Sequence, residues 1–301
     1  MAIKKLPSTG DVPRSTGVPE SLVPGGPADS AGFPWEGRTF DHHGTAFADD
    51  DGATPVLVAA AVAELRAAAA AAAAATDAAA HWAAVADIAA AHGRVIAELG
   101  AARVLVPMLA EAGDLGVTPE GKTVEKTQEL SIVTVAAPDG RRVLPVFSSV
   151  TTLASWHESA RPIPVPATQA ALAAVQELTD LIILDAATPE LEYGIRRPAL
   201  RALALGEAYV PGWADDEVLA AFRAAVATEA AVADLWLSPG DPEGRLLAPE
   251  VDVNLKLAPG LDRAALGELL ERAQAGWAAS AVIAERVDSM RVRPVAAPRG
   301  A

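Results

Sequence analysis

The segment from Glu125 to Trp156 constrains the fold more than any other part of the chain, because it predicts one complete strand–turn–strand–helix unit. Residues 129–137 form the first strand, Pro138-Asp139-Gly140 forms the turn, and residues 142–147 return as the second strand. A serine then caps the short helix. The unit contains no nucleophile with its base, no metal-ligand set and no phosphate-binding loop, so it indicates a fold rather than an activity.

Size and composition narrow the class of protein. A chain of 301 residues is long enough for two domains, each with its own core. Hydrophobic residues make up 51% and aromatic residues only 4%, so we expect a core of small residues with scattered larger anchors. The net charge of −15 repels nucleic acid and anionic membranes, and no stripe of lysine and arginine offsets it. We therefore expect no nucleic-acid partner.

The chain has no cysteine, which excludes disulfides, thiolate catalysis, iron–sulfur clusters and cysteine zinc sites. Its first residues, up to Pro7, lack the apolar core of a signal peptide. The alanine run Ala67–Ala75 lies between Arg66 and Asp77 and is shorter than the ~20 apolar residues of a membrane span. We expect a soluble, cytoplasmic protein with no cofactor and no membrane partner.

Four regions follow one another along this acidic, alanine-rich chain. Residues 1–53 are dense in proline, glycine, serine and aspartate and are predicted to form a disordered or extended arm. Residues 54–100 form an alanine-rich helical segment, and residues 101–208 form a first α/β domain. A proline- and glycine-containing linker at 209–213 leads to a second α/β domain, residues 214–301.

The patterns in both domains predict the α/β (α+β) class, with two small mixed sheets covered by helices. Leu181–Leu184 is a continuous apolar run, typical of a central strand covered on both faces. Pro107 places its strand at an edge or bulge, and the prolines around Ile163–Val165 suit a protected edge strand. Thr54 and Thr168 are each expected to cap a helix.

The arm contains a local apolar island whose aromatic residues are Phe33, Trp35 and Phe40. One interpretation is a loop that docks onto the body of the protein. The other is a short linear motif that binds a partner, because aromatic anchors carry much of the energy of protein interfaces. We take these three residues as candidate partner-binding anchors.

Arg196 and Arg197 lie where a strand ends and a helix begins. Backbone N–H groups and two guanidinium groups at such a place can hold an anion or contact a partner. The alternative is a pair of solvated arginines that balance a strongly acidic protein. We include both residues as candidate polar contacts.

Catalytic and metal sites find little support in the sequence. Ser148 and Ser149 lack the Gly-x-Ser-x-Gly turn of a nucleophilic serine, and helix capping explains them. His157 lies two helical turns, ~12 Å, from the second serine, beyond hydrogen-bond reach. His42 and His43 are adjacent in the arm, and no second histidine one helical turn away orients them for a metal. We expect no catalytic residue and no metal site.

One group of motifs stands out in the first α/β domain: Arg103-Val-Leu-Val-Pro, Glu125-Lys-Thr, Gly140-Arg-Arg-Val-Leu-Pro-Val-Phe-Ser-Ser-Val-Thr-Thr-Leu and Trp156. These motifs resemble those of SseB-family proteins, the enhanced-serine-sensitivity proteins rather than the secreted translocon protein of the same name. The resemblance covers about residues 100–210, and residues 255–292 resemble the family's C-terminal domain less specifically. The family has no established catalytic residue, cofactor or substrate, so the resemblance implies an α/β fold and a non-enzymatic or regulatory role.

Two functional hypotheses follow. The first is a non-catalytic cytoplasmic protein that binds a protein partner or regulates one. The second is a small-molecule sensor or hydrolase-like enzyme with a cleft between the two domains, which would need convergent polar groups with perturbed pKa values. A secreted translocon component would need long coiled coils or membrane-inserting helices, and the sequence shows neither.

Overall fold

The computed structural model describes Phe47 and residues 49–112, 115–117, 123–125, 128–132, 134–137 and 140–296. Phe33, Trp35, Phe40, His42 and His43 lie outside these residues, so the predictions made for them remain predictions. Residues 50–301 form one unit, which contains all the helices and sheets described below.

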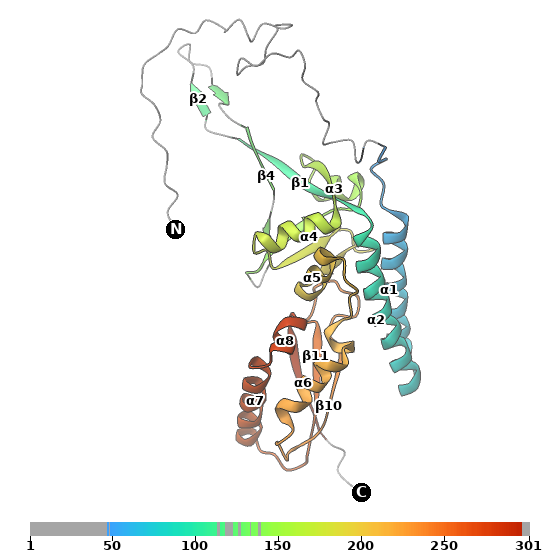
Figure 1. Ribbon diagram of the computed structural model, residues 1–301, viewed down its shortest axis with the longest axis vertical. Coiled ribbons are helices and arrows are strands. Elements are labelled where there is room, and N and C mark those ends of the chain that lie inside the picture. The colour runs from blue at the N-terminus through green and yellow to red at the C-terminus, as the bar shows by residue number, and fades with distance from the viewer. Residues whose placement is uncertain are drawn as a thin grey trace, which may run out of the picture. The chain divides into compact units, whose positions relative to one another are not determined.

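The first two helices, α1 (Val56–Ala74) and α2 (Ala78–Gly100), pack together as a hairpin (Figure 1). Among the described helices, α1 alone is long and apolar enough to cross a membrane by length and composition. Here its Val58, Val62 and Leu65 are buried within the protein core. The predicted capping role of Thr54 is wrong, because Pro55 occupies the N-cap position and the Thr54 hydroxyl pairs with Ser148 Oγ at 2.9 Å.

Three antiparallel strands form the first sheet, in the order β4 (Gln128–Ile132), β1 (Arg103–Ala112) and β7 (Arg161–Pro166). The residues predicted as one strand, 129–137, instead belong to two short strands, β4 in this sheet and β5 (Val135–Ala136) in the second sheet. The edge position predicted from Pro107 is wrong as well, since β1 is the central strand. Proline is accommodated there because pairing with β4 begins only at Met108, so the missing N–H interrupts no ladder bond.

Strand β7 lies at the edge of this sheet, as its prolines predict. Pro162, Pro164 and Pro166 alternate with residues that exchange hydrogen bonds with β1. Their backbone nitrogens therefore face the open side of the sheet, where an N–H group would otherwise be unpaired.

The second sheet has the strand order β5-β6-β8-β9, and its central pair, β6 and β8, is parallel. Its bounds are β5 (Val135–Ala136), β6 (Arg142–Val146), β8 (Leu181–Leu184) and β9 (Tyr193–Ile195). The prediction of Leu181–Leu184 as a buried central strand is confirmed. Three helices accompany the two sheets: α3 (Val150–Trp156), α4 (Ala167–Gln176) and α5 (Arg197–Leu205). Helix α4 begins at Ala167 after Pro166, so the cap predicted at Thr168 is wrong.

The C-terminal part contains a third sheet, in the order β10-β11-β12, with β11 antiparallel to β10 and parallel to β12. The buried Trp277 ring lies 5.3 Å from the Phe222 ring and anchors the covering helices. The elements of this part are η3 (Gly212–Ala214), α6 (Asp216–Val226), β10 (Val232–Pro239), β11 (Val251–Leu257), α7 (Arg263–Ala278), α8 (Ala281–Arg286) and β12 (Met290–Ala296). Earlier in the chain, a short strand β2 (Leu115–Val117) pairs with β3 (Thr123–Glu125). Helices and mixed sheets together confirm the predicted α+β class.

Candidate binding groove and buried polar clusters

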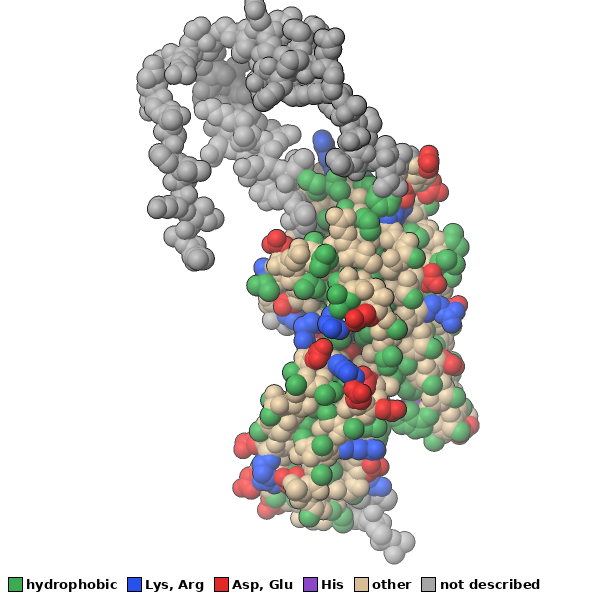
Figure 2. Space-filling view, in the orientation of Figure 1, with side chains coloured by type: hydrophobic (Ala, Val, Ile, Leu, Met, Phe, Trp, Pro, Cys, Tyr) green, Lys and Arg blue, Asp and Glu red, His purple; other side chains and the backbone are tan. Residues whose placement is uncertain are grey.

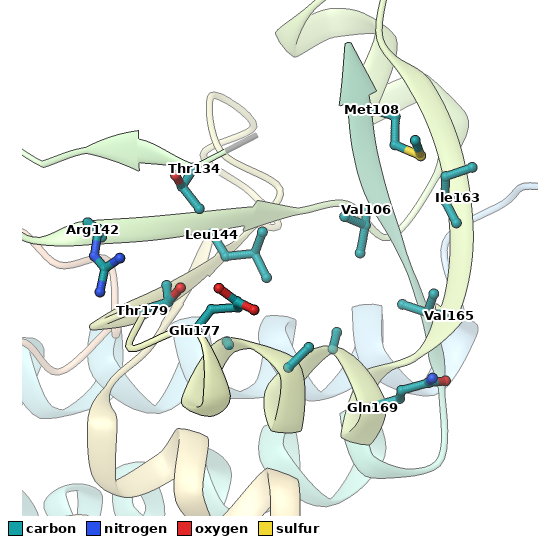
Figure 3. A pocket seen from close by; sticks show the side chains of 13 residues that line it. Val106, Met108, Thr134, Arg142, Leu144, Ile163, Val165, Gln169, Glu177 and Thr179 are labelled. Carbon is teal, nitrogen blue, oxygen red and sulfur yellow. The ribbon is translucent and has the colours of Figure 1, made fainter. Parts of the chain in front are cut away.

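A cavity of about 520 Å³ opens between helix α4 and strands β1, β6 and β7 (Figure 3). We call it the groove. Five apolar side chains from the strands line it: Val106, Met108, Leu144, Ile163 and Val165. This volume falls within the ~300–1,000 Å³ that is usual for sites of small ligands and peptide side chains.

The groove exists because α4 faces the strands with alanines. Ala170 and Ala174 are buried and Ala173 is exposed, and all three line the cavity. The larger apolar residues of the helix, Leu172 and Val175, lie on its other flank and are each 45% exposed. This arrangement reverses the usual amphipathic helix, in which the larger apolar side chains face the core.

Polar side chains surround the apolar floor. Glu177, at the C-terminal end of α4, extends its carboxylate toward Leu144, while Arg142 lies at one end of the groove (Figure 3). The Arg142 guanidinium donates a hydrogen bond to the backbone carbonyl of Leu178, and its own backbone N–H donates to Asp180. Three uncharged polar residues complete the lining: Thr134, Gln169 and Thr179.

Leu178 stands beside the groove in an unusual state. Its φ of 53° is left-handed, a conformation that costs a residue with a Cβ roughly 1–2 kcal/mol and that usually selects glycine at a helix end. Its side chain is 76% exposed, so no packing compensates for this cost. Backbone strain that persists in a folded protein is found most often at functional sites.

The groove offers little chemistry for catalysis. Among the described lining residues, only Arg142 and Glu177 carry charges, and none is a serine, cysteine, histidine or lysine. A carboxylate without a neighbouring nucleophile or second acid can bind a cation or accept a hydrogen bond. The arrangement therefore supports binding better than covalent or acid–base chemistry.

Arg196 occupies a different place from the surface contact expected of it, because it is buried between the two parts of the protein. Its Nη2 lies 2.6 Å from Asp241 Oδ2 and 2.7 Å from the Ala248 carbonyl oxygen. Its Nη1 lies 3.2 Å from both Asp288 Oδ2 and Ser289 Oγ. A contact between Arg196 and a partner would require these bonds to open.

Arg197 is exposed, but its guanidinium is also engaged. Its Nη2 donates hydrogen bonds to the carbonyl oxygens of Ala284 and Val287, at 2.7 and 2.8 Å. These carbonyls lie at the C-terminal end of α8, where a cation satisfies unpaired acceptors. Both candidate arginines thus join the α5 region to the C-terminal part.

The loop between β10 and β11, residues 240–249, makes further contacts across the same junction, and we call it the clasp. Its Gly244 carbonyl accepts a hydrogen bond at 2.7 Å from the backbone N–H of Gly194 in β9, the edge strand of the second sheet. The Pro242 carbonyl lies 3.1 Å from His92 Nε2. A Cβ on Gly194 would lie 2.3 Å from Leu246 Cγ, so only glycine fits under the clasp.

Burial controls the ionisation of the groups beneath the clasp. Burial lowers the pKa of His92 from 6.5 to about 4, although the hydrogen bond to Pro242 partly opposes this shift. Burial also raises the pKa of Tyr193 and of Glu250. Glu250 accepts hydrogen bonds from the backbone N–H groups of Gly212 and Asp288, which fix its carboxylate within the C-terminal part.

The second hypothesis placed a ligand in an interdomain cleft, and a hollow of about 410 Å³ does lie between α5 and α8. Its charged side chains pair with each other. Arg201 lies 3.1 Å from Glu207, and Arg286 lies 2.9 Å from Asp215. A ligand there would have to compete with these internal ion pairs.

Ser149 caps α3 through a reciprocal capping box with Thr152, as the sequence predicts for one of the two serines. Ser148 is 1% exposed, and its backbone N–H donates to Asp185 Oδ1 at 2.8 Å. Asp185 is fully buried with a φ of 49°, and its Oδ2 has no hydrogen-bond partner among the described residues. Burial raises the pKa of Asp185.

Sequence reasoning missed the groove, and one signal could have revealed it. Alanines recur at 170, 173 and 174 while Leu172 and Val175 fall on the opposite flank. A helix that turns its small residues toward a sheet leaves unfilled space. The paired role of Arg196 had no local signal, because Asp241 and Asp288 lie 45 and 92 residues further along the chain.

The fold and the groove define an α+β protein with an apolar groove in its N-terminal part. Residues 65–202, which contain the groove and the α2 helix, match the family model described as the SseB protein N-terminal domain. The resemblance to the SseB family predicted from the sequence is therefore confirmed over this part of the chain. No curated protein and no solved structure matches the chain.

Proposed function

We propose that this protein is a non-catalytic, cytoplasmic interaction or regulatory protein, and that the groove is its docking site for a protein partner. One observation carries the proposal: the groove has an apolar floor, and its described lining contains no serine, cysteine, histidine or lysine and no paired acid and base. Leu178, which lies between the lining residues Glu177 and Thr179 in the chain, offers a further exposed apolar side chain next to the groove residues.

The mode of docking follows from strand β7. A partner strand cannot obtain hydrogen-bond donors from Pro162, Pro164 or Pro166, so strand addition at this edge is disfavoured. We therefore propose that a partner inserts apolar side chains into the groove. On the face shown in Figure 2, acidic and basic side chains are interspersed, which suits a protein partner better than nucleic acid.

The arm supplies a second proposed contact through Phe33, Trp35 and Phe40. These residues are proposed as anchors on the partner, independent of the groove. Their replacement by alanine in the full chain is preferable to deletion of residues 1–53, because Asp50 forms a 2.7 Å ion pair with the buried Arg103.

Affinity purification from the native cell, followed by mass spectrometry, tests the proposal. Ala173→Leu fills the groove, whereas Val175→Leu adds bulk to the opposite flank of α4 and serves as the matched control. We expect the first variant, but not the control, to lose specific partners at least tenfold. Unchanged partners with both Ala173→Leu and the alanine-substituted arm would refute an interaction role for these surfaces.

The small-molecule hypothesis retains one supporting observation, the 410 Å³ hollow between α5 and α8. It predicts that Arg201→Ala and Arg286→Ala abolish the binding of a metabolite that co-purifies with the full chain. Mass spectrometry of the denatured protein extract would detect such a metabolite.

A further inference from the structure

We infer that the groove accepts an aliphatic side chain of a peptide segment whose neighbouring residue is lysine or arginine. This inference rests on the proposed docking role of the groove and adds the chemistry of the partner. It follows from the shape of the floor, the position of one carboxylate and the charge of the whole chain.

The floor selects an aliphatic group. Leu144 and Val106 are 5% and 6% exposed and form a fixed apolar base, while Ile163 at the margin is 40% exposed. Each methylene that leaves water in such a site contributes about 0.8 kcal/mol. The alanines of α4 leave the space that a leucine- or methionine-sized side chain would fill.

Glu177 selects a cation. Its side chain is exposed, and its carboxylate points into the groove toward Leu144 (Figure 3). The positive charge of Arg142 lies at the end of the groove. Its guanidinium donates a hydrogen bond to the Leu178 carbonyl, and its backbone N–H donates one to Asp180. No ion pair within 4 Å joins Glu177 to a described lysine or arginine, so the carboxylate remains available to a ligand.

The charge of the whole protein acts in the same direction. At −15, the chain attracts basic segments and repels acidic ones during encounter. An aliphatic residue beside a lysine or arginine can therefore fill the apolar floor while the basic residue pairs with Glu177. The exposed Leu178 can pack against the aliphatic stem of that basic residue.

Blocked synthetic dodecapeptides test the inference with the full chain. Four peptides of equal length contain two leucines flanked by lysines, by glutamates or by serines, or two serines flanked by lysines. Methyl NMR signals of Leu144 and Ile163 report binding in the groove. We expect the leucine–lysine peptide to shift these signals and to bind more tightly than the other three.

Variants separate the contributions. Ala173→Leu should weaken the leucine–lysine peptide at least tenfold, and Val175→Leu should not change it. Glu177→Gln should reduce the preference for lysine over serine flanks by about 1.5- to 5-fold, the range of an exposed ion pair, and salt should reduce it as well.

Three outcomes would overturn the inference. Equal binding of the serine–lysine peptide would indicate attraction by net charge alone. Equal binding of all leucine peptides would remove the role of Glu177 and leave the docking role intact. Shifts at Leu144 and Ile163 that persist in Ala173→Leu would place the peptide outside the groove, and the partner purification would then decide the proposed function separately.

Discussion

His92 Nδ1 lies 2.9 Å from the hydroxyl of Tyr193, and the two side chains come from α2 and β9. Because the Pro242 carbonyl can only accept, His92 Nε2 carries the proton and donates to it, and Nδ1 accepts from the tyrosine. This assignment requires a neutral imidazole. Protonation of His92 would add an N–H at Nδ1, and the Tyr193 hydroxyl would then have to accept this hydrogen bond instead of donating one.

Stability should therefore fall as the pH decreases from about 6.5 to about 4. The folded protein holds the pKa of His92 near 4, below its value of 6.5 when unfolded, so the unfolded chain binds more protons in this window. The loss amounts to roughly 3 kcal/mol. Urea unfolding of wild type and His92→Gln at each pH measures it, and exposed His81→Gln is the control. Parallel pH profiles for wild type and His92→Gln would contradict the prediction.

Replacement of Arg196 should destabilise the protein far more than replacement of its neighbour. Arg196→Met leaves Asp241 buried without its cation, whereas Asp288 keeps its ion pair with Arg141 at 3.0 Å, and the loss costs about 3–5 kcal/mol. Arg197→Met loses hydrogen bonds to two carbonyls at an exposed site, which costs about 1 kcal/mol. Denaturant unfolding at neutral pH compares the two variants. Equal effects would show that the buried ion pairs do not hold the junction.

Asp185→Asn should change the pH dependence of the free energy of unfolding in the direction opposite to that of His92→Gln. The folded-state pKa of Asp185 is raised, so its contribution is fully favourable below about pH 3.8 and is lost as the pH rises through the folded pKa. Asparagine tolerates the left-handed backbone and can still accept from Ser148 N–H. The free energy of unfolding of the variant relative to wild type should thus increase between pH 4 and pH 7. A constant difference across this range would exclude a titrating Asp185.

Leu178→Gly should stabilise the protein and weaken its binding. Glycine relieves the left-handed strain at φ 53°, and we expect a gain of up to about 1 kcal/mol in the free energy of unfolding. Leu178→Ala, which keeps the Cβ, should give no such gain. Both variants lose the exposed apolar side chain, so both should bind the leucine–lysine peptide more weakly. Loss of stability in the glycine variant would show that this leucine is held in place by packing.

Local signals predicted the parts of the fold that depend on neighbouring residues. Ser149 begins α3, and the apolar run of β8 lies in the middle of its sheet. Each of these outcomes depends on backbone conformation or hydrophobicity over a few residues. The edge position predicted from Pro107 was wrong because the pairing of β1 with β4 begins only at Met108. The ladder therefore needs no N–H donor at Pro107.

The sites depended on distant partners and were largely beyond prediction from the sequence. The local sequence indicates that Arg196 is a solvated residue before a helix. It becomes a buried group only through its contacts with Asp241 of the clasp and with Asp288, just before β12. The groove is a property of empty volume, which arises when α4 meets strands far from it in the chain. The residues around Leu178 include no asparagine or glycine, so the sequence does not indicate a left-handed backbone at this position.

The prolines of β7 have a consequence for behaviour at high concentration. Fibrous aggregates grow when the exposed backbone of one sheet recruits the backbone of another molecule. Here three alternate positions, Pro162, Pro164 and Pro166, offer carbonyl groups alone, so a recruited chain would leave its own carbonyls unmatched. Such an edge resists polymerisation because of its backbone chemistry, and the nearby apolar groove can remain exposed at little risk.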